Sequence, residues 1–376
     1  MLSIWRVAIE KKYCKCYYDW KLHSIVSESI SAYIFWDRNV LNISILFQIM
    51  TFIIYSDKYL LHDNASHPEN ASRLRATMEL LQKMPFYEKL QFIEPSIANE
   101  NEIAKVHSQE MIEAAKHIGW LDPDTYTNEY SYEVAKLAAG GVIKACQIVM
   151  KEGGNAFALI RPPGHHATRH RSMGFCLFNN AAMAANLLAE KGYKILIFDH
   201  DVHHGNGTQD IFYERRDVMY QSFHLHPHYP GTGRIEEVGN GEGEGYIVNA
   251  PLPHGTGEKC IEKLLDEIMI PIAKQFSPDL IIISAGFDSH HADYLGGLKL
   301  SVNFYGKIIE KFMEVQSKIV CCLEGGYNLE YLPKGIAVEI GHLCNMPIKF
   351  DDEAEGKECN EVIERLREVM KEYWEL

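Results

Sequence analysis

The sequence predicts an α/β fold of three layers, in which helices cover both faces of a central, mostly parallel sheet. Short apolar runs rich in β-branched and aromatic residues alternate with longer segments whose apolar residues recur at helical spacing. The expected strands are Thr51–Tyr55, Ala156–Ile160, Lys194–Phe198, Val218–Phe223, Leu280–Ser284 and Lys318–Leu323. The expected helices between them are Ser131–Lys151, Ala181–Lys191, Glu258–Gln275 and Ser301–Val315. This alternation indicates a parallel sheet, whose ligand site gathers at the carboxyl ends of the strands.

The chain of 376 residues divides into one domain and an atypical N-terminal extension. Residues 1–49 lack clear periodicity and carry no chemical motif, so we interpret them as an extension that a misassigned start codon would explain. The rival interpretation is a membrane anchor at residues 41–54, although this apolar run is shorter than the roughly 20 residues that a spanning helix needs. Residues 50–376 contain no repeat or long linker and are expected to form a single domain. Its tail, residues 350–376, predicts a solvated C-terminal helix.

Charge and cysteine usage narrow the class of protein. A formal net charge of -14 argues against general nucleic-acid binding. The charge suits a cationic partner such as a lysine-rich peptide or a polyamine, but ordinary surface acidity is the favoured interpretation. The nine cysteines are odd in number, lie mostly in apolar segments and form no CxxC pair, which predicts a reduced, cytoplasmic protein with buried thiols. A metal or redox role for the CxC pair Cys14 and Cys16 is the less favoured interpretation.

The most informative motif follows the run Ala156–Ile160, where two adjacent histidines come after a Pro-Pro-Gly turn. Proline restricts φ and glycine permits close backbone approach, so this loop would hold His165 and His166 still. Neutral histidine titrates near pH 7 and can accept and return a proton. The motif therefore predicts a general base at the end of this strand.

Two other expected strands also end in metal-binding side-chain types. Asp201 and His203 follow the run Lys194–Phe198, and in an extended chain residues two apart point to the same side. Asp288 follows the run Leu280–Ser284. Two carboxylates and one imidazole leave coordination positions open for water and substrate, as a catalytic transition-metal site requires.

The last expected strand runs into Gly325, Gly326 and Tyr327. The glycines permit a tight turn, and a phenol held there can donate a hydrogen bond to a developing oxyanion. Each of these side chains alone has an ordinary explanation, such as a helix cap or core packing, and their convergence at successive strand ends is what favours a site. Surface or hydrogen-bonding roles are favoured over metal binding for six further histidines, which are His224, His226, His228, His254, His290 and His291.

Taken together, these motifs resemble those of the histone deacetylase family, within the wider arginase/deacetylase fold. The matching pieces, in the family's order, are RPPGHHA at 161–167, GFCLFNN at 174–180, FDHDVHHGNGTQ at 198–209, YPGTG at 229–233, AGFDSH at 285–290 and LEGGYN at 323–328. HPENASRLRA at 67–76 resembles an early segment of the family, and the resemblance covers about residues 51–345. Arginases use a two-metal DxHxD pattern, whereas Gly205 offers no carboxylate here, so one catalytic metal ion is implied.

The resemblance implies a deacetylase domain that hydrolyses N-acetyl amides. His166 would be the general base, and His165 its partner, tuned by Asp199. Tyr327 would polarise the amide carbonyl opposite the metal. The implied ligands of zinc or iron(II) are Asp201, His203 and Asp288. The implied channel for the acylated side chain is formed by Gly174, Phe175, Tyr229 and Gly326. The implied potassium site is formed by Asp199, Asp201, His203, Ser222 and Phe223.

Two positions are similar to class II and prokaryotic members of that family. Asn206 stands where class I enzymes have aspartate beside the second histidine, and Glu324 precedes the glycine pair. Tyr327 is not histidine, so the weakened class IIa pattern does not apply. Because asparagine carries no charge, Asn206 should leave His166 less basic than aspartate would.

Three functions are compatible with these observations. The leading hypothesis is a deacetylase of acetyl-lysine in proteins or peptides. A second is an acetylpolyamine or other small-molecule amidohydrolase, which would prefer acetylated diamines to peptides. A third is a non-catalytic acyl-lysine binder, and the complete set of catalytic residue types argues against it.

Overall fold

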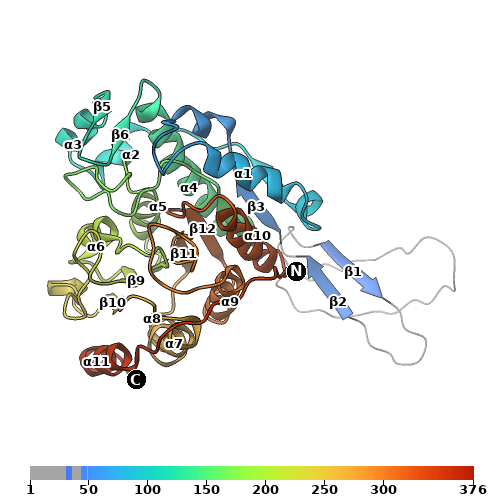
Figure 1. Ribbon diagram of the computed structural model, residues 1–376, viewed down its shortest axis with the longest axis vertical. Coiled ribbons are helices and arrows are strands. Elements are labelled where there is room, and N and C mark those ends of the chain that lie inside the picture. The colour runs from blue at the N-terminus through green and yellow to red at the C-terminus, as the bar shows by residue number, and fades with distance from the viewer. Residues whose placement is uncertain (1–30, 36–43, 49) are drawn as a thin grey trace, which may run out of the picture.

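Figure 1 shows the computed structural model, in which helices enclose an eight-stranded sheet. The structure describes residues 31–35, 44–48 and 50–376, so Cys14 and Cys16 lie outside the described residues. The strands of the sheet run in the order β10-β9-β8-β11-β12-β7-β3-β4, and every neighbouring pair is parallel. Their bounds are β3 (Thr51–Ile54), β4 (Gln91–Ile93), β7 (Asn155–Ala158), β8 (Ile195–Asp199), β9 (Val218–Leu225), β10 (Ile247–Leu252), β11 (Leu280–Ala285) and β12 (Ile319–Leu323).

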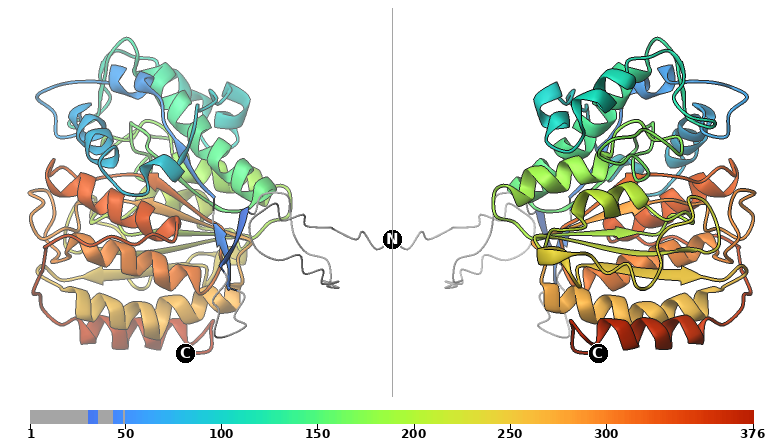
Figure 2. Two further views of the ribbon diagram at one scale, coloured as in Figure 1. Left: turned by 90° about the vertical axis from the view of Figure 1, so that its right-hand side faces the viewer. Right: turned by 90° about the vertical axis from the view of Figure 1, so that its left-hand side faces the viewer.

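Helices cover both faces of this sheet (Figures 1 and 2). One face carries α4 (Ser131–Glu152), α5 (Asn180–Ala189) and α6 (Asn206–Phe212). The other carries α1 (Ser72–Leu81), α7 (Glu258–Leu264), the π-helical η4 (Leu265–Met269), α8 (Ile270–Phe276), α9 (Val302–Met313) and α10 (Tyr331–Leu343). The C-terminal α11 (Asn360–Met370) packs beside β10 and η4. The three-layer prediction is therefore confirmed.

The remaining elements are short. They are β5 (Gly119–Trp120), β6 (Tyr126–Thr127), α2 (Glu100–Ala104), α3 (Gln109–Ala114), η1 (Asp57–Leu61), η2 (Tyr87–Lys89) and η3 (Gly241–Gly243). Among the described residues, no helix is both long enough and apolar enough to cross a membrane.

All six expected strands and three of the four expected helices are present with small differences at their ends, and the fourth, Glu258–Gln275, is divided into α7, the π-helical η4 and α8. The sequence reading missed β4 and β10, which form the two edges of the large sheet. β4 spans three residues, and Pro251 interrupts the apolar pattern of β10 at a place where an edge strand tolerates proline. It also missed an antiparallel hairpin of β1 (Ser31–Phe35) and β2 (Ser44–Gln48), within the segment interpreted as an extension.

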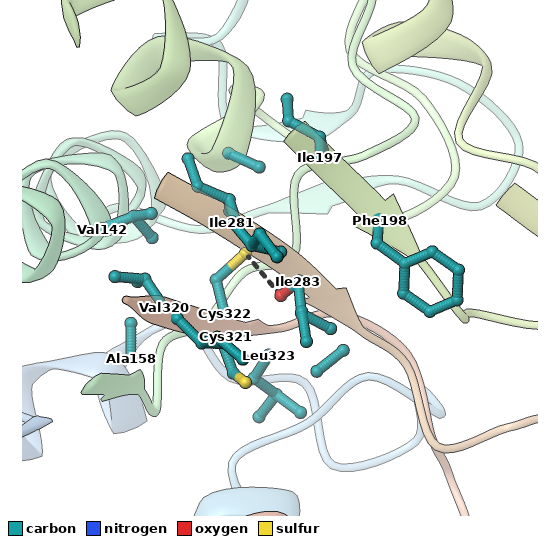
Figure 3. Close-up of a cluster of buried hydrophobic side chains, with 14 of the residues drawn as sticks. Val142, Ala158, Ile197, Phe198, Ile281, Ile283, Val320, Cys321, Cys322 and Leu323 are labelled. Carbon is teal, nitrogen blue, oxygen red and sulfur yellow. Dashed lines mark hydrogen bonds between the residues drawn. The ribbon is translucent and has the colours of Figure 1, made fainter. Parts of the chain in front are cut away.

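The buried core lies on both sides of the central strands. Figure 3 shows side chains of β7, β8, β11 and β12 packed together with Val142 of α4. The central strands are buried throughout, which explains their near-continuous apolar sequences. Two adjacent β12 residues, Cys321 and Cys322, are part of this core, and the Cys322 thiol lies 3.6 Å from the Ile283 carbonyl oxygen (Figure 3).

The expectation that all cysteines are reduced is wrong for one pair. Cys260 of α7 and Cys359, at the start of α11, form a disulfide although 99 positions separate them in the chain. Their Cα atoms lie 5.7 Å apart because α11 returns to pack near α7, a proximity that spacing cannot reveal. The other cysteines of the described residues are buried thiols, as expected: Cys146, Cys176, Cys321, Cys322 and Cys344. The cytoplasmic location, which relied on the reduced state, stays a prediction.

Candidate active site

The loop after β7 is held rigidly by buried charges. The Arg161 guanidinium, which is fully buried, donates hydrogen bonds to the Glu69 carboxylate, one of them of 2.7 Å to Oε2. Further along the loop, the backbone N–H groups of Gly164 and His165 donate to Oε2 of Glu324, at 2.7 and 3.1 Å. Glu324 follows β12, so this carboxylate ties the histidine loop to a neighbouring strand end. The loop is therefore fixed in place, as its Pro-Pro-Gly sequence predicts.

His165 is paired with a buried carboxylate. Its Nδ1 lies 3.0 Å from Oδ2 of Asp199, the last residue of β8. Burial lowers the pKa of His165, but the Asp201 and Asp199 carboxylates outweigh burial and raise that pKa to about 10. His165 is therefore held as a cation beside its neighbour.

His166 is held in the opposite state. Burial lowers its pKa well below the ordinary value, and the charges of His165 and His203 lower it further. Its Nδ1 lies 2.8 Å from Oδ1 of Asn206, which accepts a hydrogen bond. Nδ1 therefore carries the hydrogen, and Nε2 keeps a free lone pair. A neutral imidazole with an available Nε2 is the form that a general base requires.

Three predicted metal ligands converge on one point. Nδ1 of His203 lies 3.0 Å from Oδ1 of Asp201 and 3.2 Å from Oδ2 of Asp288. Oδ2 of Asp288 is buried and, apart from this ion-pair contact with His203, has no hydrogen-bond partner among the described residues. An orphaned carboxylate oxygen is costly in a protein interior unless a cation satisfies it. Two carboxylates and one imidazole also form a donor set suited to zinc or iron(II), so these residues fit a single metal ion.

The reason why Asp201 and His203 share a side differs from the one expected. β8 ends at Asp199, so both residues lie in a turn and not in an extended strand. Oδ1 of Asp201 accepts a hydrogen bond of 2.9 Å from the His203 backbone N–H, and this contact brings the imidazole back toward the carboxylate. The alignment arises from a side-chain-to-backbone turn and not from strand alternation.

Two glycines let the backbone approach the carboxylates closely. A Cβ atom on Gly286 would lie 2.0 Å from Oδ2 of Asp201, and one on Gly325 would lie 2.2 Å from Oδ2 of Asp288. The Gly325 N–H instead donates a hydrogen bond of 2.8 Å to Asp201. Any larger residue at either position would displace a predicted ligand.

Aromatic rings surround the predicted base and the predicted phenol. The ring of Tyr229 stands edge-to-face against His166 at 5.1 Å between centroids, and the ring of Phe175 meets Tyr327 at 5.7 Å. Gly174 lies against His166, since a Cβ there would come within 2.5 Å of its ring. Burial and the Asp288 charge raise the pKa of Tyr327 well above its ordinary value, so this phenol stays protonated. Gly326 precedes Tyr327 in the turn after β12 and lies against Phe287, so it too lies beyond the carboxyl ends of the strands, as the predicted metal ligands do.

The residues of the predicted potassium site also lie close together. Asp199 and Ser222 are direct neighbours in the register of β8 and β9, and Phe223 follows on β9. Oδ2 of Asp199 accepts a hydrogen bond of 3.1 Å from Tyr220. The potassium ion itself stays a prediction.

Sequence reasoning missed the role of Glu324 and the stacking of His228 on His203, although it expected a hydrogen-bonding role for His228. Glu324 was noted only as a subfamily marker, and its hydrogen bonds depend on a loop 160 residues earlier in the chain. His228 stacks on the His203 ring at 4.9 Å between centroids and is hydrogen-bonded to the Leu295 carbonyl oxygen. The signal available in the sequence was its neighbour Tyr229, which begins one of the motifs that resemble the family.

His290 and His291 take hydrogen-bonding roles, as expected. Both Nε2 atoms lie 2.9 Å from the Asp352 carboxylate. Nδ1 of His290 accepts from the Ala292 N–H, so Nε2 carries the hydrogen of the neutral ring and cannot also bind a metal ion.

Comparisons with known proteins agree with this geometry. A family model described as the histone deacetylase domain matches residues 67–343. The chain belongs to the histone deacetylase family. Its members are zinc-dependent hydrolases, so the chain is an enzyme of that class and the predicted family resemblance is confirmed.

Two archaeal proteins and one solved structure illustrate the similarity. A probable deacetylase of Archaeoglobus fulgidus is 40% identical over 296 residues, which cover 75% of this chain and 82% of the relative. A probable deacetylase of Methanothermobacter thermautotrophicus is 41% identical over 290 residues, covering 74% of this chain and 86% of the relative. The crystal structure of the HDA15 HD domain superimposes with a TM-score of 0.81 at 36% identity, covering 87% of this chain and 96% of that chain. This similarity confirms the arginase/deacetylase fold.

Proposed function

We propose that this deacetylase hydrolyses the N-acetyl amide of acetyl-lysine side chains in proteins or peptides, and that residues 50–376 form its one catalytic domain. The observation that carries the proposal is the arrangement of Asp201, His203 and Asp288 around one point, beside a neutral His166 with a free Nε2. A metal centre next to a general base is the machinery of amide hydrolysis.

Each residue has a defined task in this proposal. Asp201, His203 and Asp288 would hold zinc or iron(II), which would supply a water molecule of near-neutral pKa and a Lewis acid for the amide carbonyl. His166 accepts the proton of the attacking water at Nε2 and returns it to the departing amine. Tyr327 keeps its phenolic hydrogen and donates it as a hydrogen bond to the carbonyl oxygen as negative charge develops there. The positive charge of His165, which Asp201 and Asp199 favour, lowers the pKa of His166 and so keeps His166 neutral and able to accept the proton.

The aromatic walls set the shape of the substrate. In this proposal Phe175, whose ring meets Tyr327, and Tyr229, whose ring meets His166, would wall a passage for a long methylene chain. An uncharged acetyl tip enters such a passage at lower desolvation cost than a free ammonium group. A potassium ion bound by Asp199, Asp201, His203, Ser222 and Phe223 would stabilise the backbone beneath the metal ligands.

The acetylpolyamine hypothesis remains the second candidate because of charge near the passage. Asp122 and Asp124 are close enough to Tyr229 to raise its pKa, after the larger effect of burial. Acidic groups there favour a cationic substrate, whether a basic peptide or a polyamine.

One experiment separates these candidates. Purified zinc-loaded protein is given an acetyl-lysine peptide and N-acetylputrescine in parallel, and acetate release is measured for wild type and Tyr327→Phe. We expect turnover of the peptide to exceed that of the diamine, and the variant to lose about 100- to 1,000-fold in kcat with unchanged zinc content. Faster turnover of the diamine would favour an acetylpolyamine deacetylase instead. Binding of the peptide without turnover of either substrate would favour the non-catalytic binder.

A further inference from the structure

A buried charged pair lies directly beneath the predicted metal ligands and takes no part in the proposed reaction. His200, which separates Asp199 from Asp201, and Glu339 of α10 are both fully buried. Nε2 of His200 lies 2.9 Å from Oε1 of Glu339. Nδ1 of the same ring lies 2.9 Å from the carbonyl oxygen of Gly286. Nδ1 therefore donates to a carbonyl oxygen, while Nε2 faces the carboxylate in an ion pair that lacks the alignment of a hydrogen bond.

The protonation of this pair follows from its partners. A carbonyl oxygen only accepts hydrogen bonds, so Nδ1 of His200 carries a hydrogen. The contact between Nε2 and the Glu339 carboxylate then requires one further shared proton, and the pair is neutral as a whole. Buried pairs of this kind are frequently no more stabilising than apolar residues of the same volume. Core packing alone therefore gives no reason for charged groups here.

The position of the pair gives such a reason. The His200 ring connects the end of β8, which leads to Asp201, with the turn after β11, which leads to Asp288. The Ser289 hydroxyl strengthens this link by donating a hydrogen bond of 2.7 Å to the His200 carbonyl oxygen. Glu339 then fixes the ring from a third element, α10. The two carboxylates of the metal centre thus come from segments that this one side chain joins.

The spacing of these segments leaves little tolerance. Gly286, whose carbonyl oxygen faces His200, lies so close to Asp201 that a Cβ atom would meet Oδ2 at 2.0 Å. Gly286 is also two residues before Asp288. A small movement of this turn would change the separation of the two carboxylates, on which the affinity for a small divalent ion depends.

We propose that the His200–Glu339 pair is a positioning device that sets the distance between Asp201 and Asp288 and thereby the metal affinity of the site. Neither residue touches the substrate or the reacting atoms. Both act through the hydrogen bond to Gly286, which Glu339 orients by holding the opposite side of the ring. The effect should appear in metal binding even when no substrate is present.

Three variants of the full chain separate positioning from packing. Glu339→Gln keeps a polar group of the same size facing Nε2 of His200, while Nδ1–H still donates to Gly286. Glu339→Leu leaves Nε2 without a partner. The double variant His200→Phe with Glu339→Leu removes all the polar groups and leaves an apolar core of similar volume. For each, the Kd of zinc is measured by competition with a chromophoric chelator, and Tm is measured on the metal-free protein.

The expected pattern differs between the two measurements. Glu339→Leu should weaken zinc binding by about 10- to 100-fold, whereas Glu339→Gln should stay within about 3-fold of wild type. The double variant should regain the metal-free Tm that Glu339→Leu loses, yet keep the weakened zinc binding. If Glu339→Leu does not fold, the comparison of Glu339→Gln with the double variant decides.

Two results would overturn the inference. One is wild-type zinc affinity in the double variant, which would mean that the pair only fills space. The other is an equal loss of affinity in Glu339→Gln and in the two variants that remove the polar contact between residues 200 and 339. Since zinc binding is read without substrate, a failure of the deacetylase assignment would leave this result unaffected.

Discussion

The contact between His166 and Asn206 makes the pH dependence of the enzyme a direct test of its proposed base. Nδ1 of His166 lies 2.8 Å from Oδ1 of Asn206, an uncharged amide. Asn206→Asp keeps the shape of the side chain and replaces that amide with a carboxylate. The added negative charge favours the protonated imidazole, so the pKa of His166 must rise.

The size of this shift follows from the distance. For charge centres about 4 Å apart, the attraction is about 4 kcal/mol at an effective dielectric constant of about 20, and about 1 kcal/mol in bulk water. With about 1.36 kcal/mol for each pKa unit, the rise lies between about 0.8 and 3 units. His166 is inactive as a base when protonated, so the acid limb of the profile should move to higher pH by this amount.

The assay is kcat/KM of the zinc-loaded enzyme on an acetyl-lysine peptide as a function of pH, since this parameter reports the base in the free enzyme. Asn206→Ala is the control, because it removes the hydrogen bond without adding charge. We expect the alanine variant to lose activity without an upward shift of its acid limb. An acid limb that stays in place in Asn206→Asp, or moves upward equally in both variants, would refute the assignment of His166 as the base.

Three further predictions concern packing and stability. Gly174→Ala should lower kcat/KM more than 10-fold because its Cβ would lie 2.5 Å from His166. Gly192→Ala is the control, since Gly192 also has a positive φ but a Cβ there would have no neighbour within 4 Å. Equal kcat/KM values for the two variants would contradict this prediction. Burial raises the pKa of Glu69, but two buried arginines lower it to about 2 from an ordinary 4.5. Glu69→Gln should therefore lower the free energy of unfolding, measured with urea at neutral pH, by about 3–5 kcal/mol. This difference from wild type should shrink as the pH falls from 4.5 to about 2. A difference that stays constant over this pH range would contradict the prediction. Cys359→Ser should lower the free energy of unfolding by about 2–5 kcal/mol because the disulfide closes a loop of 99 residues, and unchanged stability under oxidising conditions would exclude that link.

The sheet and the location of the site were predictable because each rests on local patterns. Buried parallel strands need continuous apolar sequence, as Leu280–Ser284 has, and polar chemistry at their carboxyl ends stands out against it. The edges of the sheet were not predictable in the same way. β10 contains a proline that a central strand would exclude, so its pairing with β9 depends on tertiary context.

The interactions that support the site could not be predicted from the sequence because they join segments that are far apart in the chain. Glu324 holds a loop 160 residues away, and Glu339 reaches His200 from a helix that carries no motif. Neither carboxylate has a local pattern that reveals its partner. The Cys260–Cys359 disulfide was hidden for the same reason, since an odd count of cysteines gives no pairing.

The most direct test of the account is the metal dependence of acetate release. Protein stripped by a chelator is titrated with zinc, and turnover of an acetyl-lysine peptide is followed together with bound zinc for wild type and Asp288→Asn. Activity should return in proportion to bound zinc and reach its maximum at about one ion per chain, while the variant binds zinc weakly and stays inactive. Full activity in the stripped enzyme, or in a variant that binds no zinc, would contradict a metal centre at Asp201, His203 and Asp288.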